Sequence, residues 1–90
     1  MQSEQKIQSK IIKYLESLGC YVIKTVTTNK RGCPDLLFCH DGKFMAIEVK
    51  AEGKLSNVSE IQQFHLDLIN KTGGKAFAAD SLDTVKKIVY

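Results

Sequence analysis

The stretch RGCPDLLFCHDGKFMAIEVK, residues 31–50, constrains the fold of this 90-residue chain more than any other segment. Two apolar runs flank an Asp-Gly dipeptide, and this dipeptide between apolar runs is typical of a tight β-hairpin turn. Pro34 cannot donate to a strand ladder, so it belongs at the start of the first run. We therefore expect antiparallel strands over residues 35–39 and 44–50.

The second of these strands carries two charges among apolar residues. Side chains alternate between the two faces of a strand. Met45, Ile47 and Val49 then share a face typical of a core, whereas Glu48 and Lys50 share the opposite face, roughly 6–7 Å apart. The two charges are either a solvated pair on an open face of the sheet or part of a site.

The remaining elements follow from apolar spacing, capping serines and terminating glycines. We expect a helix over about 3–18, a strand over 20–26, a second long helix from Ser59 to Gly73, a strand over 75–79 and a short last helix. This αβββαβα order predicts one sheet packed with helices in two or three layers, an α/β fold with a mixed sheet. No repeat or linker is visible, so we expect a single domain over residues 1–90.

Composition is that of an ordinary globular protein, with 43% hydrophobic and 26% charged residues. No apolar run approaches the roughly 20 residues of a membrane helix, and the N-terminal MQSEQKIQSK lacks the apolar segment of a signal peptide. We therefore expect an intracellular, cytoplasmic protein without a membrane partner. The net charge of +3 is compatible with a polyanionic partner.

Three cysteines, Cys20, Cys33 and Cys39, show no CxxC spacing. An odd number without paired spacing does not favour a disulfide framework and fits a reducing compartment. Cys33, Cys39 and His40 would supply only three of the four ligands of a structural zinc site. Small cysteines packed in the core are the better explanation.

The residues that carry chemistry lie at the open end of the hairpin. Asp35 begins one strand, and Glu48 and Lys50 end its partner, so the hairpin brings the three together. Two neighbouring carboxylates repel each other unless a cation lies between them. Hard oxygen ligands favour Mg²⁺ or Mn²⁺, and a nearby lysine can orient or deprotonate water and stabilise a phosphate oxygen. This combination favours hydrolysis of a phosphodiester.

The motif formed by Pro34-Asp35, twelve intervening residues and Glu48-Val49-Lys50 resembles that of the PD-(D/E)xK nuclease superfamily. The segments GCPDLL, AIEVK and GKLS, and a glutamine on the second helix, are similar to the VRR-NUC branch of this superfamily. The resemblance extends over nearly the whole chain. It implies a restriction-endonuclease-like αβββαβ core, with a central mixed sheet flanked by helices.

The same resemblance implies roles for the residues at the end of the hairpin. Asp35 and Glu48 would bind Mg²⁺, or Mn²⁺ in its place, together with the backbone carbonyl of Val49, and Lys50 would be the catalytic lysine. The expected reaction is hydrolysis of DNA that leaves a 5′-phosphate and a 3′-hydroxyl. The small stand-alone members of the family look like homodimers that act on branched DNA, such as four-way junctions. The resemblance therefore also implies a homodimer and a substrate of this kind.

Two further site residues follow from the resemblance, and each has a structural alternative. Glu4 corresponds to an acid near the metal, often bound through water. An acid in the first turn is also favoured by the helix dipole alone, although Glu4 shares a helical face with Ile7 and Ile11. Gln62 corresponds to a glutamine that borders the site, but it is equally the expected capping-box partner of Ser59.

The polar loop before Asp35 contains Thr28, Asn29, Lys30 and Arg31. It is either a solvated loop or a DNA-binding loop whose residues contact phosphates without reading the base sequence. A nuclease needs such contacts beside its site, so we favour DNA binding.

Two other functions remain open at this point. A non-catalytic nucleic-acid-binding module would bind DNA with an affinity that falls with salt and ignores Mg²⁺. A partner-dependent subunit, for example one that acts with a helicase or another DNA-processing protein, would have an intact site and be inactive alone.

Overall fold

The computed structural model describes residues 1–90, and its elements follow the predicted order. The elements are α1 (Glu4–Ser17), β1 (Tyr21–Lys24), β2 (Leu36–His40), β3 (Lys43–Val49), the 3-10 turn η1 (Leu55–Asn57), α2 (Glu60–Lys71), β4 (Lys75–Ala79) and α3 (Leu82–Ile88). Ser3, Ser59 and Ser81 cap the three helices with their side chains. The predicted boundaries therefore differ from the observed ones by one or two residues.

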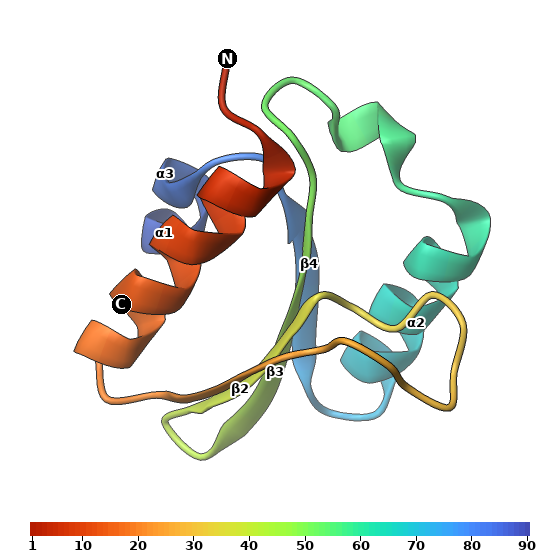
Figure 1. Ribbon diagram of the computed structural model, residues 1–90. Helices are drawn as coiled ribbons and strands as arrows, with labels where there is room; N and C mark the ends of the chain where they lie inside the picture. Colours follow the sequence, from red (N-terminus) through yellow and green to blue (C-terminus); the bar gives the residue numbers. More distant parts are fainter.

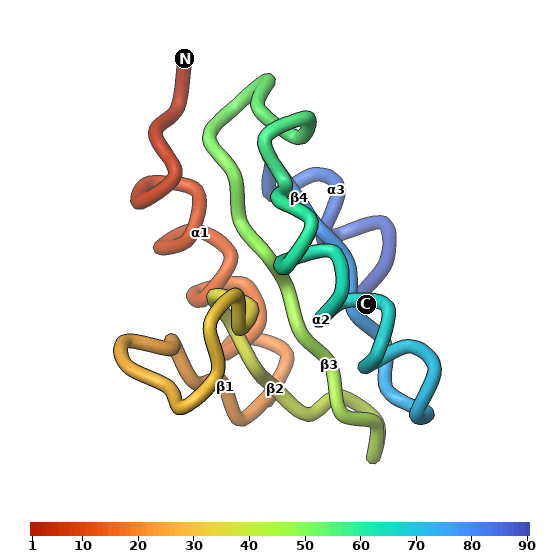
Figure 2. The backbone as a smooth tube through the Cα atoms, turned by 90° about the vertical axis from the view of Figure 1, so that its right-hand side faces the viewer, coloured from red at the N-terminus to blue at the C-terminus, as the bar shows by residue number.

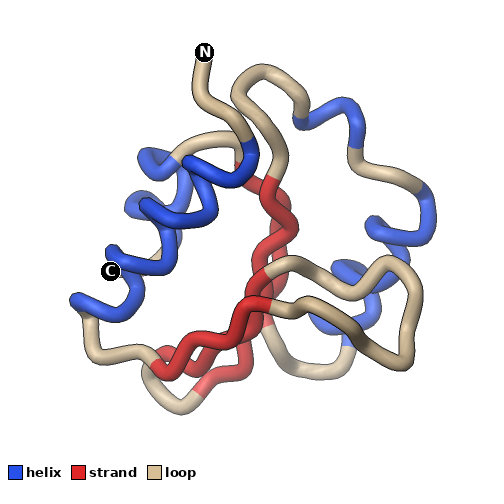
Figure 3. Tube along the Cα trace, in the orientation of Figure 1, coloured by secondary structure: helices blue, strands red, loops and turns tan.

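The strands, red in Figure 3, come together in one sheet. It is a mixed sheet of four strands in the order β1-β2-β3-β4. β1, β2 and β3 are antiparallel neighbours, and Leu36 on β2 faces Ile47 on β3. β4 runs parallel to β3, with Ala79 beside Val49. The parallel pair requires a crossover, which α2 supplies.

Helices cover both faces of the sheet (Figure 1). α1 and α3 lie together on one face, and α2 lies on the other. Figure 2 looks onto the α2 side and shows this helix running along β3 and β4, which are also the strands that it contacts. The expected fold class, a mixed sheet flanked by helices, is confirmed. No helix has both the length and the apolar character to cross a membrane.

The core is divided by the sheet into two unequal parts. The larger part lies under α1 and α3 and consists of Ile7, Ile11, Leu15, Leu36, Phe38, Met45, Ile47, Val49, Ala79, Val85 and Val89. The smaller part lies under α2 and consists of Ala46, Leu66 and Ala76. Most apolar burial thus takes place on the α1 side, and the α2 side retains room for polar groups.

β3 is buried on both of its faces from Met45 to Val49. The alternative of an open sheet face around Glu48 is therefore wrong. Helix α2 covers that face because Leu66 packs against Ala46. The sequence pattern alone could not show this cover, since the helix that provides it lies more than ten residues further along the chain.

β1 is shorter than the predicted strand over 20–26. The assigned strand ends at Lys24, although Thr25 still continues the ladder by donating its N–H to the carbonyl of Asp35 at 2.9 Å. Val26 then turns into solvent and is 90% exposed. The apolar residue at this position is part of a loop, not of the sheet.

Candidate active site

Asp35 and Glu48 are brought together by the hairpin register. Leu36 pairs with Ile47, so the residue before β2 falls opposite Glu48. The Asp35 carboxylate accepts a hydrogen bond from the Val49 N–H, with Oδ2 and N 2.7 Å apart. The main chain of β3 therefore fixes the Asp35 side chain beside the neighbouring Glu48, as the hairpin predicted.

Lys50 completes this group one residue after β3. Its N–H donates to the carbonyl of Ala79 at 2.9 Å and so extends the parallel ladder. The Nζ atom lies 3.5 Å from Oε2 of Glu48 and 2.9 Å from Oε1 of Gln62. The Lys50 side chain is only 12% exposed, so two acceptors hold a largely buried ammonium group.

Gln62 makes the contacts expected for both of its alternative roles, the capping-box partner of Ser59 and a residue that borders the site. Its Oε1 accepts the Ser59 N–H at 2.9 Å, and its own N–H donates to Ser59 Oγ at 3.2 Å, which completes a capping box. The same Oε1 accepts the hydrogen bond from Lys50. The start of α2 is therefore tied directly to the end of β3.

The surroundings of the Glu48 carboxyl disfavour its ionised form. Burial raises the pKa of Glu48, the neighbouring Asp35 raises it further, and Lys50 opposes the shift. The resulting pKa is about 8, compared with an ordinary value of 4.5. At neutral pH the Glu48 carboxyl of the metal-free protein is therefore mostly protonated.

The donor set at this pair fits a hard divalent cation. Oε1 of Glu48 is buried without any hydrogen-bond partner, although buried carboxyl oxygens normally have one. A cation at this oxygen would satisfy it and relieve the repulsion from Asp35. Val49 directly follows Glu48 in the chain, and its carbonyl stays a predicted ligand.

Glu4 is not drawn into this pair. It begins α1 and is half-buried. No group of three or more His, Cys, Asp or Glu side chains lies close enough to hold a metal. Direct ligation by Glu4 is therefore not seen in this structure, and its role through water stays a prediction.

The predicted DNA-binding residues lie on an exposed loop between β1 and β2. Thr28, Asn29, Lys30 and Arg31 are all exposed. Thr28 Oγ1 donates to the carbonyl of Lys30 at 2.7 Å, which tightens the tip of the loop. The loop leads directly into Asp35, and its main chain lies close to α2 (Figure 1), where His65 contacts the carbonyl of Arg31.

One buried polar residue was missed. Gln8 on α1 is only 6% exposed, and its Oε1 has no partner. The sequence does contain a signal, because Gln8 follows Glu4 by four residues and lies next to the apolar face of Ile11 and Leu15. A glutamine at the edge of an apolar helical face is an indication of a buried polar group.

The alternative zinc site is not formed. Cys33, Cys39 and His40 make no ligand cluster. His40 instead lies 3.6 Å from the Cys20 sulfur through Nδ1, and its Nε2 donates to the carbonyl of Tyr90 at 3.0 Å. The expectation of core cysteines is wrong for Cys39, which is exposed. Its position near the hairpin turn places it on the part of the sheet that α2 does not cover.

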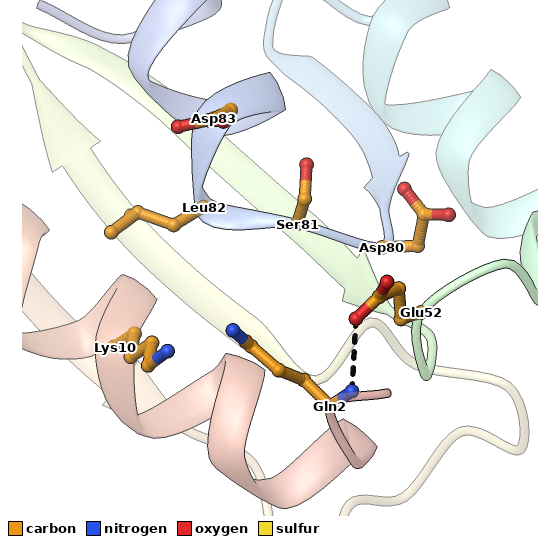
Figure 4. A pocket seen from close by; sticks show the side chains of 7 residues that line it. All are labelled: Gln2, Lys10, Glu52, Asp80, Ser81, Leu82 and Asp83. Atoms are coloured by element: carbon orange, nitrogen blue, oxygen red, sulfur yellow. Dashed lines mark hydrogen bonds between the residues drawn. The ribbon is translucent and has the colours of Figure 1, made fainter.

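A separate pocket of about 230 Å³ lies between the start of α1 and the start of α3 (Figure 4). It contains none of the predicted site residues, and two of its three carboxylates, Glu52 and Asp80, already have structural partners. Glu52 accepts the Gln2 N–H at 2.9 Å, and Asp80 accepts the Gly53 N–H at 3.0 Å. These bonds hold the loop after β3 in place, so the pocket is a feature of the fold.

Comparison with known proteins agrees with this architecture. The mixed sheet between helices defines an α/β domain, and Asp35, Glu48 and Lys50 lie together at the ends of two of its strands. A family model, the VRR-NUC domain, matches residues 1–83. The chain therefore belongs to the VRR-NUC family, and the resemblance seen in the sequence is confirmed.

Solved structures support the same assignment. A structure described as a VRR-NUC domain is 26% identical, with a TM-score of 0.82, and the match covers 98% of this chain and 95% of that one. Another, described as a VRR-NUC domain protein, is 20% identical with a TM-score of 0.76, covers 96% and 84% of the two chains, and supports the fold. No match is found among the curated proteins.

Proposed function

We propose that this chain is a metal-dependent DNA endonuclease that hydrolyses phosphodiester bonds. The observation that carries the proposal is the pairing of Asp35 and Glu48, with an unpartnered buried oxygen on Glu48, beside the ammonium of Lys50. Family membership supports a nuclease-type activity. The positive net charge and the exposed basic loop support a nucleic-acid substrate.

We assign the metal site to the carboxylates of Asp35 and Glu48 and the carbonyl of Val49, with Glu4 acting through water. Bound Mg²⁺, or Mn²⁺ in its place, would supply a positive charge for a phosphate oxygen and an acidified water. Oxygen ligands of this kind favour these ions over softer metals. The Val49 N–H holds one oxygen of Asp35, so this carboxylate is oriented before any ion binds.

We assign Lys50 as the catalytic lysine and Gln62 as the residue that orients it. The hydrogen bond from Nζ to Gln62 leaves two of the three ammonium donors for Glu48 and for substrate. An ammonium held in a largely buried position can stabilise the charge that develops on a phosphate oxygen or donate a hydrogen bond to an attacking water. The expected products carry a 5′-phosphate and a 3′-hydroxyl.

The proposed substrate is branched DNA, four-way junctions above all, cut by a homodimer. Each chain has one candidate site, and two strands must be cut to resolve a junction. Closed two-fold symmetry is the commonest way to place two identical sites. An exposed apolar surface that includes Tyr21, Ile23 and Phe44 is compatible with contact between two chains.

The test is cleavage of labelled single-stranded, duplex, flap and four-way-junction DNA with Mg²⁺, with Mn²⁺ and with EDTA. Lys50→Ala and Asp35→Asn should abolish cutting, because they remove the ammonium and one metal ligand, while DNA binding is retained. Lys71→Ala and Asp67→Asn, which make the same changes of charge on exposed positions of α2, are the matched controls. Retained cutting in either site variant would contradict the mechanism.

Binding without cutting in every metal would instead favour the two other functions. A binding module would bind with an affinity that falls with salt and is the same with Mg²⁺ and with EDTA. A partner-dependent subunit would gain activity on addition of a helicase or other DNA-processing partner.

A further inference from the structure

The loop between β1 and β2 is held at its base by Thr25. The Thr25 N–H donates to the carbonyl of Asp35, and its Oγ1 donates to the carbonyl of Pro34, both at 2.9 Å. These bonds close the two ends of the loop on each other. The position of the loop relative to the candidate metal ligand Asp35 is therefore fixed at this end.

The far side of the loop is held by α2. Nε2 of His65 lies 2.8 Å from the carbonyl oxygen of Arg31. A carbonyl only accepts, so Nε2 carries the hydrogen and donates it. The next residue, Gly32, has a φ of +83°, and a Cβ there would lie 3.0 Å from Cγ1 of Ile61. The main chain of the loop thus packs directly on the first two turns of α2.

The side chains that this anchored main chain carries point into solvent. Thr28, Asn29, Lys30 and Arg31 are exposed. Neither Lys30 nor Arg31 takes part in an ion pair within the chain. A fixed backbone with free cationic side chains is well suited to contacts with phosphates, which set the position of a nucleic acid.

We propose that His65 is a positioning residue, which holds the loop between β1 and β2 for contact with DNA. This proposal rests on the proposed nuclease function. Its hydrogen bond to Arg31 holds the loop in the conformation that presents Lys30 and Arg31 to the DNA backbone. The same helix bears Gln62, which contacts Lys50, so α2 connects the loop to the candidate site. Anchoring the loop before binding lowers the cost of ordering it when DNA binds.

The experiment compares His65→Ala, which loses the donor, with His65→Gln, whose amide keeps one, and with Gln63→Ala as an exposed control on the same helix. Affinity for a labelled four-way junction is measured in EDTA at several salt concentrations, and hydrogen exchange is measured on the DNA-free protein. We expect His65→Ala to weaken binding by about three- to tenfold and to speed exchange in residues 27–33. His65→Gln should recover most of both, and Gln63→Ala should change neither.

Two further readouts separate positioning from a loss of general stability. In the Lys30→Ala/Arg31→Ala background the His65→Ala change should have little further effect on affinity, because the side chains that it positions are gone. In steady-state cleavage His65→Ala should raise KM and leave kcat nearly unchanged. A full extra loss of affinity in that background, or a fall in kcat alone, would overturn the proposal.

Failure of the proposed function gives a different result. If the wild-type chain does not bind DNA, the positioning role is overturned together with the nuclease, even where His65→Ala speeds loop exchange. If the wild-type chain binds and cuts DNA but His65→Ala changes neither affinity nor exchange, only the role of His65 is overturned.

Discussion

The buried carboxyl of Glu48 needs a proton or a cation beside its unpartnered oxygen. Its ionisation should therefore change the free energy of unfolding. Its pKa is about 8 in the folded, metal-free chain and 4.5 ordinarily, so the folded state binds more protons between these values. The free energy of unfolding therefore falls as pH rises from about 4.5 to about 8 and then levels off. Denaturant unfolding in EDTA at several pH values measures this.

Glu48→Gln is the control for this titration, because an amide of the same shape does not ionise. Its unfolding free energy should lack the decline toward pH 8, and the variant should be at least as stable as the wild type above that pH. Addition of Mg²⁺ should stabilise the wild type more than the variant at pH 8–9. An equal decline with pH in both proteins would show that Glu48 is not the group that titrates.

At Gly74, the addition of a single carbon atom, Cβ, should affect the stability of the protein. A Cβ there would lie 2.8 Å from Cγ2 of Ile69 and 2.9 Å from the carbonyl oxygen of Phe44. A main-chain oxygen cannot move aside as a flexible side chain does. Gly74→Ala should therefore lower the free energy of unfolding by about 1–3 kcal/mol, whereas Lys75→Ala, on an exposed neighbour, should change it by less than about 0.5 kcal/mol.

At the scale of elements, the start of α2 both caps the helix and contacts the candidate site. Oε1 of Gln62 accepts from Ser59 and from Lys50, so the helix cap and the candidate site share one atom. Ser59→Ala removes only the cap and should cost about 1 kcal/mol of stability with little loss of cleavage. Gln62→Ala removes both, and should lower kcat as well. Equal kcat values in the two variants would reduce Gln62 to a capping residue.

The elements were the most predictable part of this molecule, because their signals are local. Ser3 and Ser59 cap helices as predicted, and the Asp-Gly turn sets the register that places Asp35 beside Glu48. The cover that α2 gives to Glu48 was not predictable, since it depends on how a distant helix packs. The contact between His65 and Arg31 was missed for the same reason.

The α2 helix also shows that the spacing of apolar residues does not predict which of them are buried. Apolar residues with helical spacing suggest a packed face, yet only Leu66 is buried. Ile61, Phe64 and Leu68 are 42%, 58% and 45% exposed. Helical spacing identifies the helix correctly, but it does not say which of its apolar residues meet the sheet.

At the scale of the whole molecule, one candidate site per chain makes the number of chains a mechanistic question. A homodimer would cut the two strands of a junction with two separate sites, and light scattering should then give a mass near twice 10.1 kDa. Mixing wild-type chains with an excess of Lys50→Ala chains should produce dimers with a single working site. These should leave a cruciform plasmid nicked, whereas wild-type dimers linearise it, because the second strand has no competent lysine. A monomeric mass together with unchanged linearisation in the mixture would mean that one site cuts both strands in succession.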